Sequence, residues 1–371
     1  MAENKDKKVL NVPHLRFPEF TERWDTYRIA DILCIGNGRD YKHLSKGDIP
    51  VFGTGGYMTS VNECLYEGET TFIGRKGTIN KPFYYNGKFW TVDTLFYTHS
   101  FKRVIPKFVY CLFQTINWLR YNEASGVPSL SKDTIEKIKV RIPQLDEQKK
   151  IAKLLSLLDE RIATQNKIIE DLKKLKYAII EMEYGNMAKS ISYIGDFIEQ
   201  TSKRNKDCAI LNVLSVSNSQ GFIQQSEQFE NRIVASDDTS NYKIVARNDF
   251  AFNPARINVG SIARLTTFER GIVSPMYICF RTKDNLFPEY LDYYFESKRF
   301  FAEIQKRLEG SVRQCLSFEG LCNIPLCIPT VEVQQQIGKR LSTLAKEIKL
   351  EIDFLELLQR QKRFLLHQIF I

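Results

Sequence analysis

One strand-and-helix segment occurs twice in this chain, and the duplication constrains the fold more than any other feature. The segment RIPQLDEQKKIAKLLSLLDERI begins at Arg141, and CIPTVEVQQQIGKRLSTLAKEI begins at Cys327, an offset of 186 residues. The chain has 371 residues, which exceeds the usual size of one domain. We therefore expect two related halves. The matched positions are Ile142, Pro143, Gln148, Ile151, Leu155, Ser156, Leu158 and Ile162 in the first copy, and Ile328, Pro329, Gln334, Ile337, Leu341, Ser342, Leu344 and Ile348 in the second.

Both copies continue as long amphipathic helices. From Asp146 to Met182, apolar residues recur at spacings of three, four and seven, with no proline or glycine between them. The second copy keeps this register, and Gln165 and Glu351 place a polar residue at the same interior position. A stripe this narrow needs a partner helix, and the other copy has the matching length and pattern. The sequence therefore predicts a coiled coil of the two long helices.

The regions before the two helices are rich in strand patterns. Thr71–His99 alternates β-branched and aromatic residues, with a turn expected at Asn86–Gly87. Asn248–Thr282 has the same character, and its Gly-Ser-Ile at Gly260 corresponds to the Gly-Thr-Ile at Gly77. Each region then turns helical and passes through a glycine-bearing loop and a Leu-Ser pair into the repeated segment. The two halves thus share an order of elements and differ in sequence.

The charge of the chain favours an anionic partner. The formal net charge is +9 and the pI is about 9.0, which suits nucleic acid first and a membrane surface second. The chain has no run of about 18 apolar residues, and its start, MAENKDKKVL, lacks the apolar core of a signal peptide. We expect a cytoplasmic protein.

The cysteines and histidines do not predict a metal site. The eight cysteines form no C-x-x-C pair, and the chain has only four histidines. Free thiols in a reducing compartment are the expected state.

The duplicated segments, together with the opening VPHLRFPEFTERWDTYRIADI at Val12, resemble the specificity subunits of type I restriction-modification systems. The likeness covers nearly the whole chain, although the second copy reads VEVQQQI where the family has an acidic-Gln pair. It implies an α+β protein with two target-recognition domains, held apart by two antiparallel helices in a pseudo-twofold repeat. The expected domains are residues 12–145 (first target-recognition domain), 146–184 (first long helix), 185–331 (second target-recognition domain) and 332–371 (second long helix).

The resemblance also implies the function and the partners. Each target-recognition domain would read one half of a split, asymmetric site in double-stranded DNA, and the chain itself would have no catalytic activity and no cofactor. Two modification subunits would bind along the helices and use S-adenosylmethionine. Restriction subunits would hydrolyse ATP with Mg²⁺ and cleave. No membrane is expected as a partner.

Two other classes of function fit the residues less well. A self-contained methyltransferase needs an Asn/Asp-Pro-Pro-aromatic motif, but the sequence NPAR at Asn253 lacks the second proline and the aromatic ring. The sequence FGTGGY at Phe52 lacks the Lys-Ser/Thr of a phosphate-binding loop, so a hairpin or a loop approaching a base is expected there. A basic coiled-coil scaffold would not need two large, divergent strand-rich domains.

Candidate DNA contacts are loop residues that can hydrogen bond to base edges or phosphates. Arginine and lysine suit guanine, asparagine and glutamine suit adenine, and hydroxyls suit either. The candidates in the first region are Tyr57, Arg75, Lys76, Thr78, Asn80, Lys81, Ser125 and Ser129, and those in the second are Ser217, Asn218, Asn253, Arg256, Asn258, Ser261, Arg313 and Gln314.

Overall fold

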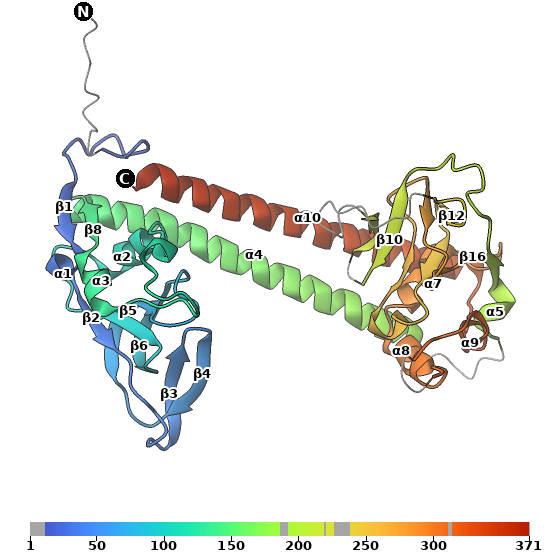
Figure 1. The fold of residues 1–371 in the computed structure, drawn as a ribbon, viewed down its shortest axis with the longest axis horizontal. Helices are drawn as coiled ribbons and strands as arrows, with labels where there is room; N and C mark the ends of the chain where they lie inside the picture. The colour runs from blue at the N-terminus through green and yellow to red at the C-terminus, as the bar shows by residue number, and fades with distance from the viewer. Residues whose placement is uncertain (1–11, 186–191, 219, 226–237, 311–313, 371) are drawn as a thin grey trace, which may run out of the picture. The chain divides into compact units, whose positions relative to one another are not determined.

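The chain divides into two compact units. The structure, a computed structural model, describes residues 12–185, 192–218, 220–225, 238–310 and 314–370. The first unit comprises Met1–Asn166 with Asp353–Ile371, and the second comprises Lys167–Ile352. Each unit therefore combines one strand-rich region with part of both long helices (Figure 1).

The two predicted long helices are present as α4 (Leu145–Gly185) and α10 (Val331–Ile369). In the first unit the start of α4 lies beside the end of α10, where Lys362 Nζ is 2.5 Å from Asp159 Oδ1. In the second unit the end of α4 lies beside the start of α10, where Arg340 pairs with Glu183. The helices therefore run antiparallel, as the resemblance implied.

The first unit is built on a six-stranded, mostly antiparallel sheet in the order β2-β7-β5-β6-β3-β4. Strands β3 and β6 are the one parallel pair recorded in it. A separate antiparallel pair, β1 and β8, leads into α4. The elements before α4 are β1 (Asp25–Arg28), α1 (Ile29–Ile32), β2 (Cys34–Asn37), β3 (Lys46–Gly53), β4 (Gly56–Val61), β5 (Tyr66–Gly74), β6 (Phe83–Thr91), β7 (Leu95–His99), α2 (Pro106–Phe113), η1 (Trp118–Tyr121), α3 (Lys132–Lys137) and β8 (Lys139–Ile142).

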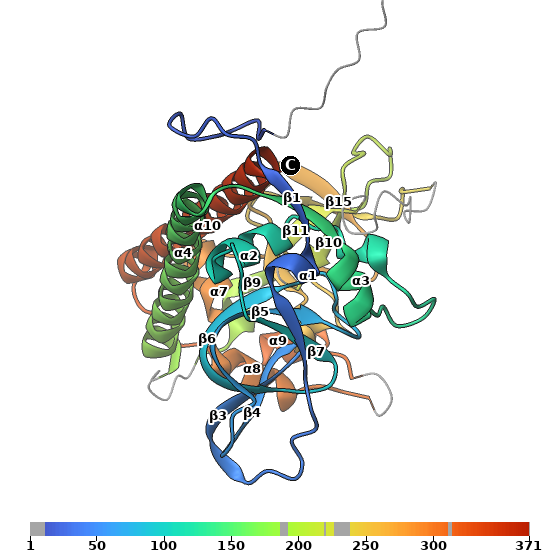
Figure 2. The same cartoon turned by 90° about the vertical axis from the view of Figure 1, so that its left-hand side faces the viewer.

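The segment FGTGGY forms a hairpin, as predicted. Strands β3 and β4 pair up to Gly53 opposite Gly56, so only two residues make the turn. Gly56 has a φ of 104°, a conformation that glycine adopts readily. The hairpin lies at the end of the first unit opposite β1 (Figure 1 and Figure 2).

The turn predicted at Asn86–Gly87 is wrong, because both residues lie inside β6. Gly87 pairs with Gly68 of β5, and both glycines have φ near 140° (139° and 140°). A Cβ on Gly87 would come within 3.3 Å of the Tyr85 side chain. Glycine is therefore needed here because the paired strands have a positive φ at this point, and not because the chain turns.

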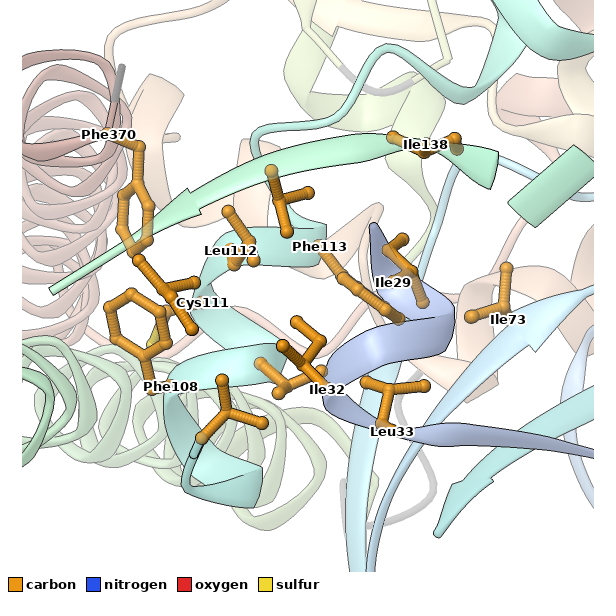
Figure 3. Close-up of a cluster of buried hydrophobic side chains, with 14 of the residues drawn as sticks. Ile29, Ile32, Leu33, Ile73, Phe108, Cys111, Leu112, Phe113, Ile138 and Phe370 are labelled. Carbon is orange, nitrogen blue, oxygen red and sulfur yellow. The ribbon is translucent and has the colours of Figure 1, made fainter. Parts of the chain in front are cut away.

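The core of the first unit joins its strand-rich region to the helix pair. Trp24, Phe108 and Phe370 are buried together, and the Trp24 ring centroid lies 6.1 Å from that of Phe370. Figure 3 shows Phe370, which directly follows α10, facing Phe108 of α2, with Ile29 and Ile32 of α1 in the same cluster. The end of α10 is thus part of the first unit's core, although it lies far away in the sequence.

The second unit contains two four-stranded sheets, in the orders β11-β10-β15-β12 and β14-β13-β16-β9. Its main core places Tyr184 of α4 and Leu341 of α10 against α7 and α9. The prediction of two strand-rich regions with different sequences is confirmed. The elements are α5 (Ile194–Phe197), β9 (Ile198–Thr201), β10 (Val213–Ser217), β11 (Gly221–Gln224), β12 (Lys243–Ala246), β13 (Phe250–Phe252), η2 (Ile257–Val259), β14 (Ile262–Arg264), β15 (Arg270–Val273), β16 (Ile278–Thr282), α7 (Pro288–Tyr294), α8 (Lys298–Gln305) and α9 (Phe318–Cys322).

Membrane-spanning helices and metal-binding clusters are both absent from the described residues. No described helix is both long and apolar enough to cross a membrane. Within the same residues, no group of three or more His, Cys, Asp or Glu side chains is arranged to hold a metal ion.

Candidate nucleic-acid interface

An open polar cavity of about 770 Å³ lies between two loops of the first unit. Arg75 and Lys76, which follow β5, line one side, and Glu123, Ser129 and Lys132 line the other. Three of the candidate residues, Arg75, Lys76 and Ser129, are therefore brought to one place. The full lining is Asn37, Arg75, Lys76, Asp93, Thr94, Phe96, Glu123, Ala124, Val127, Ser129, Leu130, Ser131 and Lys132.

Three hydrogen bonds, which we call the loop frame, hold the two walls of this cavity. Glu123 donates its backbone N–H to the Ser129 carbonyl at 3.0 Å, and Leu130 donates its own to the Arg75 carbonyl at 2.8 Å. The Ser131 hydroxyl accepts the backbone N–H of Thr134 at 3.1 Å and so caps α3. The loop frame fixes the backbone at Arg75 and leaves its side chain on the cavity wall.

The guanidinium of Arg75 is held by two contacts. Its Nη1 donates to the Asp93 carbonyl at 3.2 Å, and its Cζ lies 5.9 Å from the ring centroid of Phe96. The Phe96 ring is only 2% exposed, so it is a rigid support. An arginine has five N–H donors, and one bond to Asp93 leaves the others for a ligand.

The opposite wall carries an oriented carboxylate. Glu123 Oε1 accepts hydrogen bonds from the Ser131 hydroxyl at 2.7 Å and from the Thr134 hydroxyl. These two bonds, that of Thr134 foremost, lower the pKa of Glu123. With Asp93 on the first wall, the cavity holds two carboxylates beside three cationic side chains. A ligand must therefore be compatible with both the cationic and the anionic side chains of the cavity.

The second unit repeats the loop frame. Its loop residues lie 186 residues after those of the first unit, whereas Pro254 lies 179 residues after Arg75. Glu309 donates its backbone N–H to the Cys315 carbonyl at 2.9 Å, and Leu316 donates its own to the Pro254 carbonyl at 3.0 Å. The Ser317 hydroxyl caps α9 by accepting a backbone N–H at 3.0 Å. Pro254 thus occupies the position that Arg75 has in the first unit. The same frame presents a different side chain in each unit.

The other candidates of the first unit are all exposed. Tyr57 lies on the β3–β4 hairpin and is 64% exposed. The hairpin approaches the cavity loop, because a Cβ on Gly77 would be 3.7 Å from Thr54 Oγ1. The exposed candidates in the β5–β6 connection and the 122–131 loop are Thr78, Asn80, Lys81 and Ser125.

The second unit also gathers most of its candidates. Ser261 donates its hydroxyl to the Val216 carbonyl at 3.4 Å, which places it beside the end of β10, where Ser217 and Asn218 lie. Arg256 and Asn258 are exposed on the loop that contains η2, and Gln314 is exposed beside the loop frame.

Two candidates of the second unit are buried. Asn253 is 6% exposed and its Oδ1 accepts the Ala255 N–H at 3.1 Å, while Ser261 is 2% exposed. Both side chains have structural roles in this conformation. Their contacts with DNA stay predictions that would need the loop to open. Arg313 lies outside the described residues.

One basic cavity of the second unit was not anticipated. It has a volume of about 750 Å³, and Lys203, Arg204, Lys206 and Arg270 line it together with Asp207. The run SKRNK was the available signal in the sequence. It was missed because a short charge run alone also fits a solvated surface.

A comparison with protein families decides what these units are. The model described as "Type I restriction modification DNA specificity domain" matches residues 21–174 and again residues 186–360. The chain belongs to this family. The family model therefore matches the chain twice, once over most of each strand-rich region and the long helix that follows it.

Individual relatives agree with this assignment. The type I restriction enzyme MjaVIII specificity subunit of Methanocaldococcus jannaschii is 24% identical over 339 residues, which cover 81% of this chain and 75% of the relative. The MpnII specificity subunit of Mycoplasma pneumoniae is 25% identical over 191 residues, covering 49% of this chain and 56% of the relative. The crystal structure of a type I S subunit from M. genitalium has the same fold, with a TM-score of 0.67, 13% identity, and coverage of 97% and 99%.

The chain is the DNA-recognition subunit of a type I restriction-modification system. It is not itself an enzyme, because catalysis in these systems resides in the partner subunits. As a specificity subunit, it belongs to a complex with other subunits that acts on DNA. A DNA-recognition subunit must present a surface for reading DNA, and the cavities described above need no catalytic residues for that role.

Proposed function

We propose that each unit of this specificity subunit reads one half of a split and asymmetric DNA sequence. The repeated loop frame carries this proposal: Arg75 and Ser129 of the first unit are replaced by Pro254 and Cys315 of the second. Base edges are distinguished by the donors and acceptors offered to them. Two matched frames with unlike side chains should therefore select two unlike half-sequences.

The proposal extends to the partners. Two modification subunits dock on the helices, one for each unit, and restriction subunits join the same complex. Support comes from apolar side chains that remain exposed on the helices of both units. They are Leu157, Leu357 and Phe364 in the first unit, and Ile168, Leu175 and Leu350 in the second. Exposed apolar rows on a helix are typical of a protein interface.

No cofactor belongs to this chain in the proposed assembly. S-adenosylmethionine is held by the modification subunits, and ATP and Mg²⁺ by the restriction subunits, in the cytoplasm. The purified chain with S-adenosylmethionine and DNA should then transfer no methyl group. Methylation by the chain alone would favour the self-contained methyltransferase.

Methylome sequencing tests the central claim. Cells that lack other type I systems would express the chain with its modification subunit, and every methylated motif would be mapped. We expect one motif with two different half-sequences and a fixed gap of unspecified bases. A palindromic motif, or one uninterrupted motif, would contradict two independent readers. Cells with the modification subunit alone are the control.

A further inference from the structure

We infer that Arg75 reads a guanine in the half-site of the first unit, and that the equivalent position of the second unit reads no guanine. This inference rests on the proposed function and names the residue that determines one base of the first half-site. The pair of positions is defined by the loop frame, in which the carbonyls of Arg75 and Pro254 accept the same hydrogen bond, from Leu130 and Leu316.

The neighbourhood of the two positions supports their equivalence. Gly74 and Asn253 directly precede the two positions, and each lies against a carbonyl from the far side of its loop. A Cβ on Gly74 would meet the Thr78 carbonyl, and the Asn253 N–H donates to the Ser261 carbonyl at 3.0 Å. The second loop is longer, because η2 lies between Pro254 and Gly260. The frame is thus shared and the loop that it supports differs.

The guanidinium of Arg75 is already ordered before any ligand arrives. The Asp93 carbonyl and the buried Phe96 ring fix its position. A planar guanidinium that keeps two free N–H groups can bind O6 and N7 of guanine in the major groove. Because the side chain is ordered in advance, it loses less rotamer entropy on binding than a free arginine would.

The charges of the cavity distinguish a base from a phosphate. Asp93 and Glu123 line it with Arg75, so a phosphate on the Arg75 guanidinium would also face two carboxylates, which offset part of the attraction of Lys76 and Lys132. A base edge carries no net charge, so it avoids this repulsion and still accepts from the guanidinium. Lys76 lines the same cavity and is exposed like Arg75, but it carries an ammonium group in place of a guanidinium; its backbone pairs with Ser129. Lysine acts as a point charge, which suits a phosphate.

The test uses the assembled complex of this chain with its modification subunit. Arg75→Lys, Arg75→Ala and Lys76→Ala would each be compared with the unaltered chain by selection of bound duplexes from a randomised library. Lys88→Ala is the matched control, because Lys88 is exposed on β6 and does not line the cavity. Thermal unfolding of each complex would check that the variants fold.

We expect Arg75→Lys and Arg75→Ala to lose preference at one position of one half-site, by roughly 5- to 100-fold, with the other half unchanged. Arg75→Lys should keep the salt dependence of binding, because the charge is retained. Lys76→Ala should weaken all sequences alike, with a shallower salt slope. Lys88→Ala should bind as the unaltered chain does.

Two results would overturn the inference and leave the proposed function standing. In the first, Arg75→Ala weakens binding to all sequences alike and keeps the full base preference, which means that Arg75 contacts a phosphate. In the second, both Arg75 variants keep the original split motif. If the unaltered complex selects no split motif at all, the proposed function fails and this inference fails with it.

Discussion

Gln148 and Gln334 make the same three hydrogen bonds in the two units. The Oε1 of Gln148 accepts the Ile105 N–H at 3.1 Å, and its Nε2 donates to the Arg103 and Pro143 carbonyls, both at 2.8 Å. The Gln334 side chain does the same with Phe287, Asn285 and Pro329, at 2.8, 3.2 and 2.9 Å. Each glutamine is fully buried, so it ties a long helix to the segment that starts α2 or α7.

Gln148→Ala should lower the free energy of unfolding of the first unit by about 3 kcal/mol, because it leaves a buried N–H and two carbonyls without partners. All three tryptophans of the chain, Trp24, Trp90 and Trp118, lie in this unit, so their fluorescence follows its unfolding in urea. Gln334→Ala should change the fluorescence midpoint less and the circular dichroism midpoint more.

Gln144→Ala is the matched control for this experiment, since Gln144 is exposed just before α4. It should leave both midpoints unchanged. A Gln148→Ala protein with the original fluorescence midpoint would show that the three bonds contribute nothing net.

The repeated segment could be recognised in the sequence because patterns between neighbouring residues define it. A helix stripe follows a period of 3.6 residues, and a buried glutamine at a matched position, such as Gln148, marks a shared contact. Asn86–Gly87 was misread because a turn signal and a strand that needs glycine look alike without the partner strand. Gly68, which pairs with Gly87, lies 19 residues earlier and no local pattern connects the two.

The candidate interface was predicted only in part. Loop residues such as Arg75 and Lys76 could be chosen from their chemistry, and the structure places both beside one cavity. The burial of Asn253 and Ser261 could not be predicted from their chemistry, since it results from packing between β10 and the η2 loop. The Asp93 carbonyl that holds Arg75 is a backbone atom, which no side-chain pattern reveals.

A buried ion pair anchors the segment before β1 to the first copy of the repeat only. Arg16 donates from Nε and Nη2 to the two Glu147 oxygens at 2.8 and 2.7 Å, and Trp24 Nε1 lies 3.3 Å from the same carboxylate. The Glu147 side chain is 2% exposed. The matching position of the second copy is Val333, which is 40% exposed.

Glu147→Ala should therefore destabilise the first unit by about 3–5 kcal/mol, because it leaves Arg16 charged and unpaired in a buried site. The double variant Arg16→Ala/Glu147→Ala should lose less than the two single variants together. Urea unfolding followed by tryptophan fluorescence gives all three values, and Val333→Ala is the control. Strictly additive losses would mean that the two side chains are not coupled.

The cysteines should differ widely in reactivity. Burial raises the pKa of the Cys111 thiol to about 12, and it does the same for Cys279. Cys64 and Cys208 are exposed. The reactive species is the thiolate, so at pH 8 iodoacetamide should label Cys64 and Cys208 while Cys111 and Cys279 stay protonated and inaccessible.

Peptide mass spectrometry of the native protein at a series of times would give the rate at each cysteine. The same protein in urea is the control, and all four thiols should react there at similar rates. Equal native rates at Cys111 and Cys64 would contradict the burial of the first core.

The docking of two modification subunits predicts that each can be removed separately. Leu357 and Phe364 of α10 are 57% and 60% exposed in the first unit, and Ile168 and Leu175 of α4 are 40% and 51% exposed in the second. Within each pair the residues are seven apart, so they lie on one helix face. A lysine at these positions would put a charge into an apolar interface, which opposes binding.

Native mass spectrometry at saturating modification subunit should show two copies of that subunit on the unaltered chain. Leu357→Lys/Phe364→Lys should leave one copy, and so should Ile168→Lys/Leu175→Lys, because each pair belongs to a different unit. Gln359→Lys, at an exposed polar position of α10, adds one lysine charge without removing an apolar side chain and should keep both copies. If both double variants still bind two copies, the exposed apolar rows are not the docking surfaces. If the unaltered chain binds only one copy at saturation, the proposed stoichiometry is wrong, because two equivalent helix-bearing units should each take a partner.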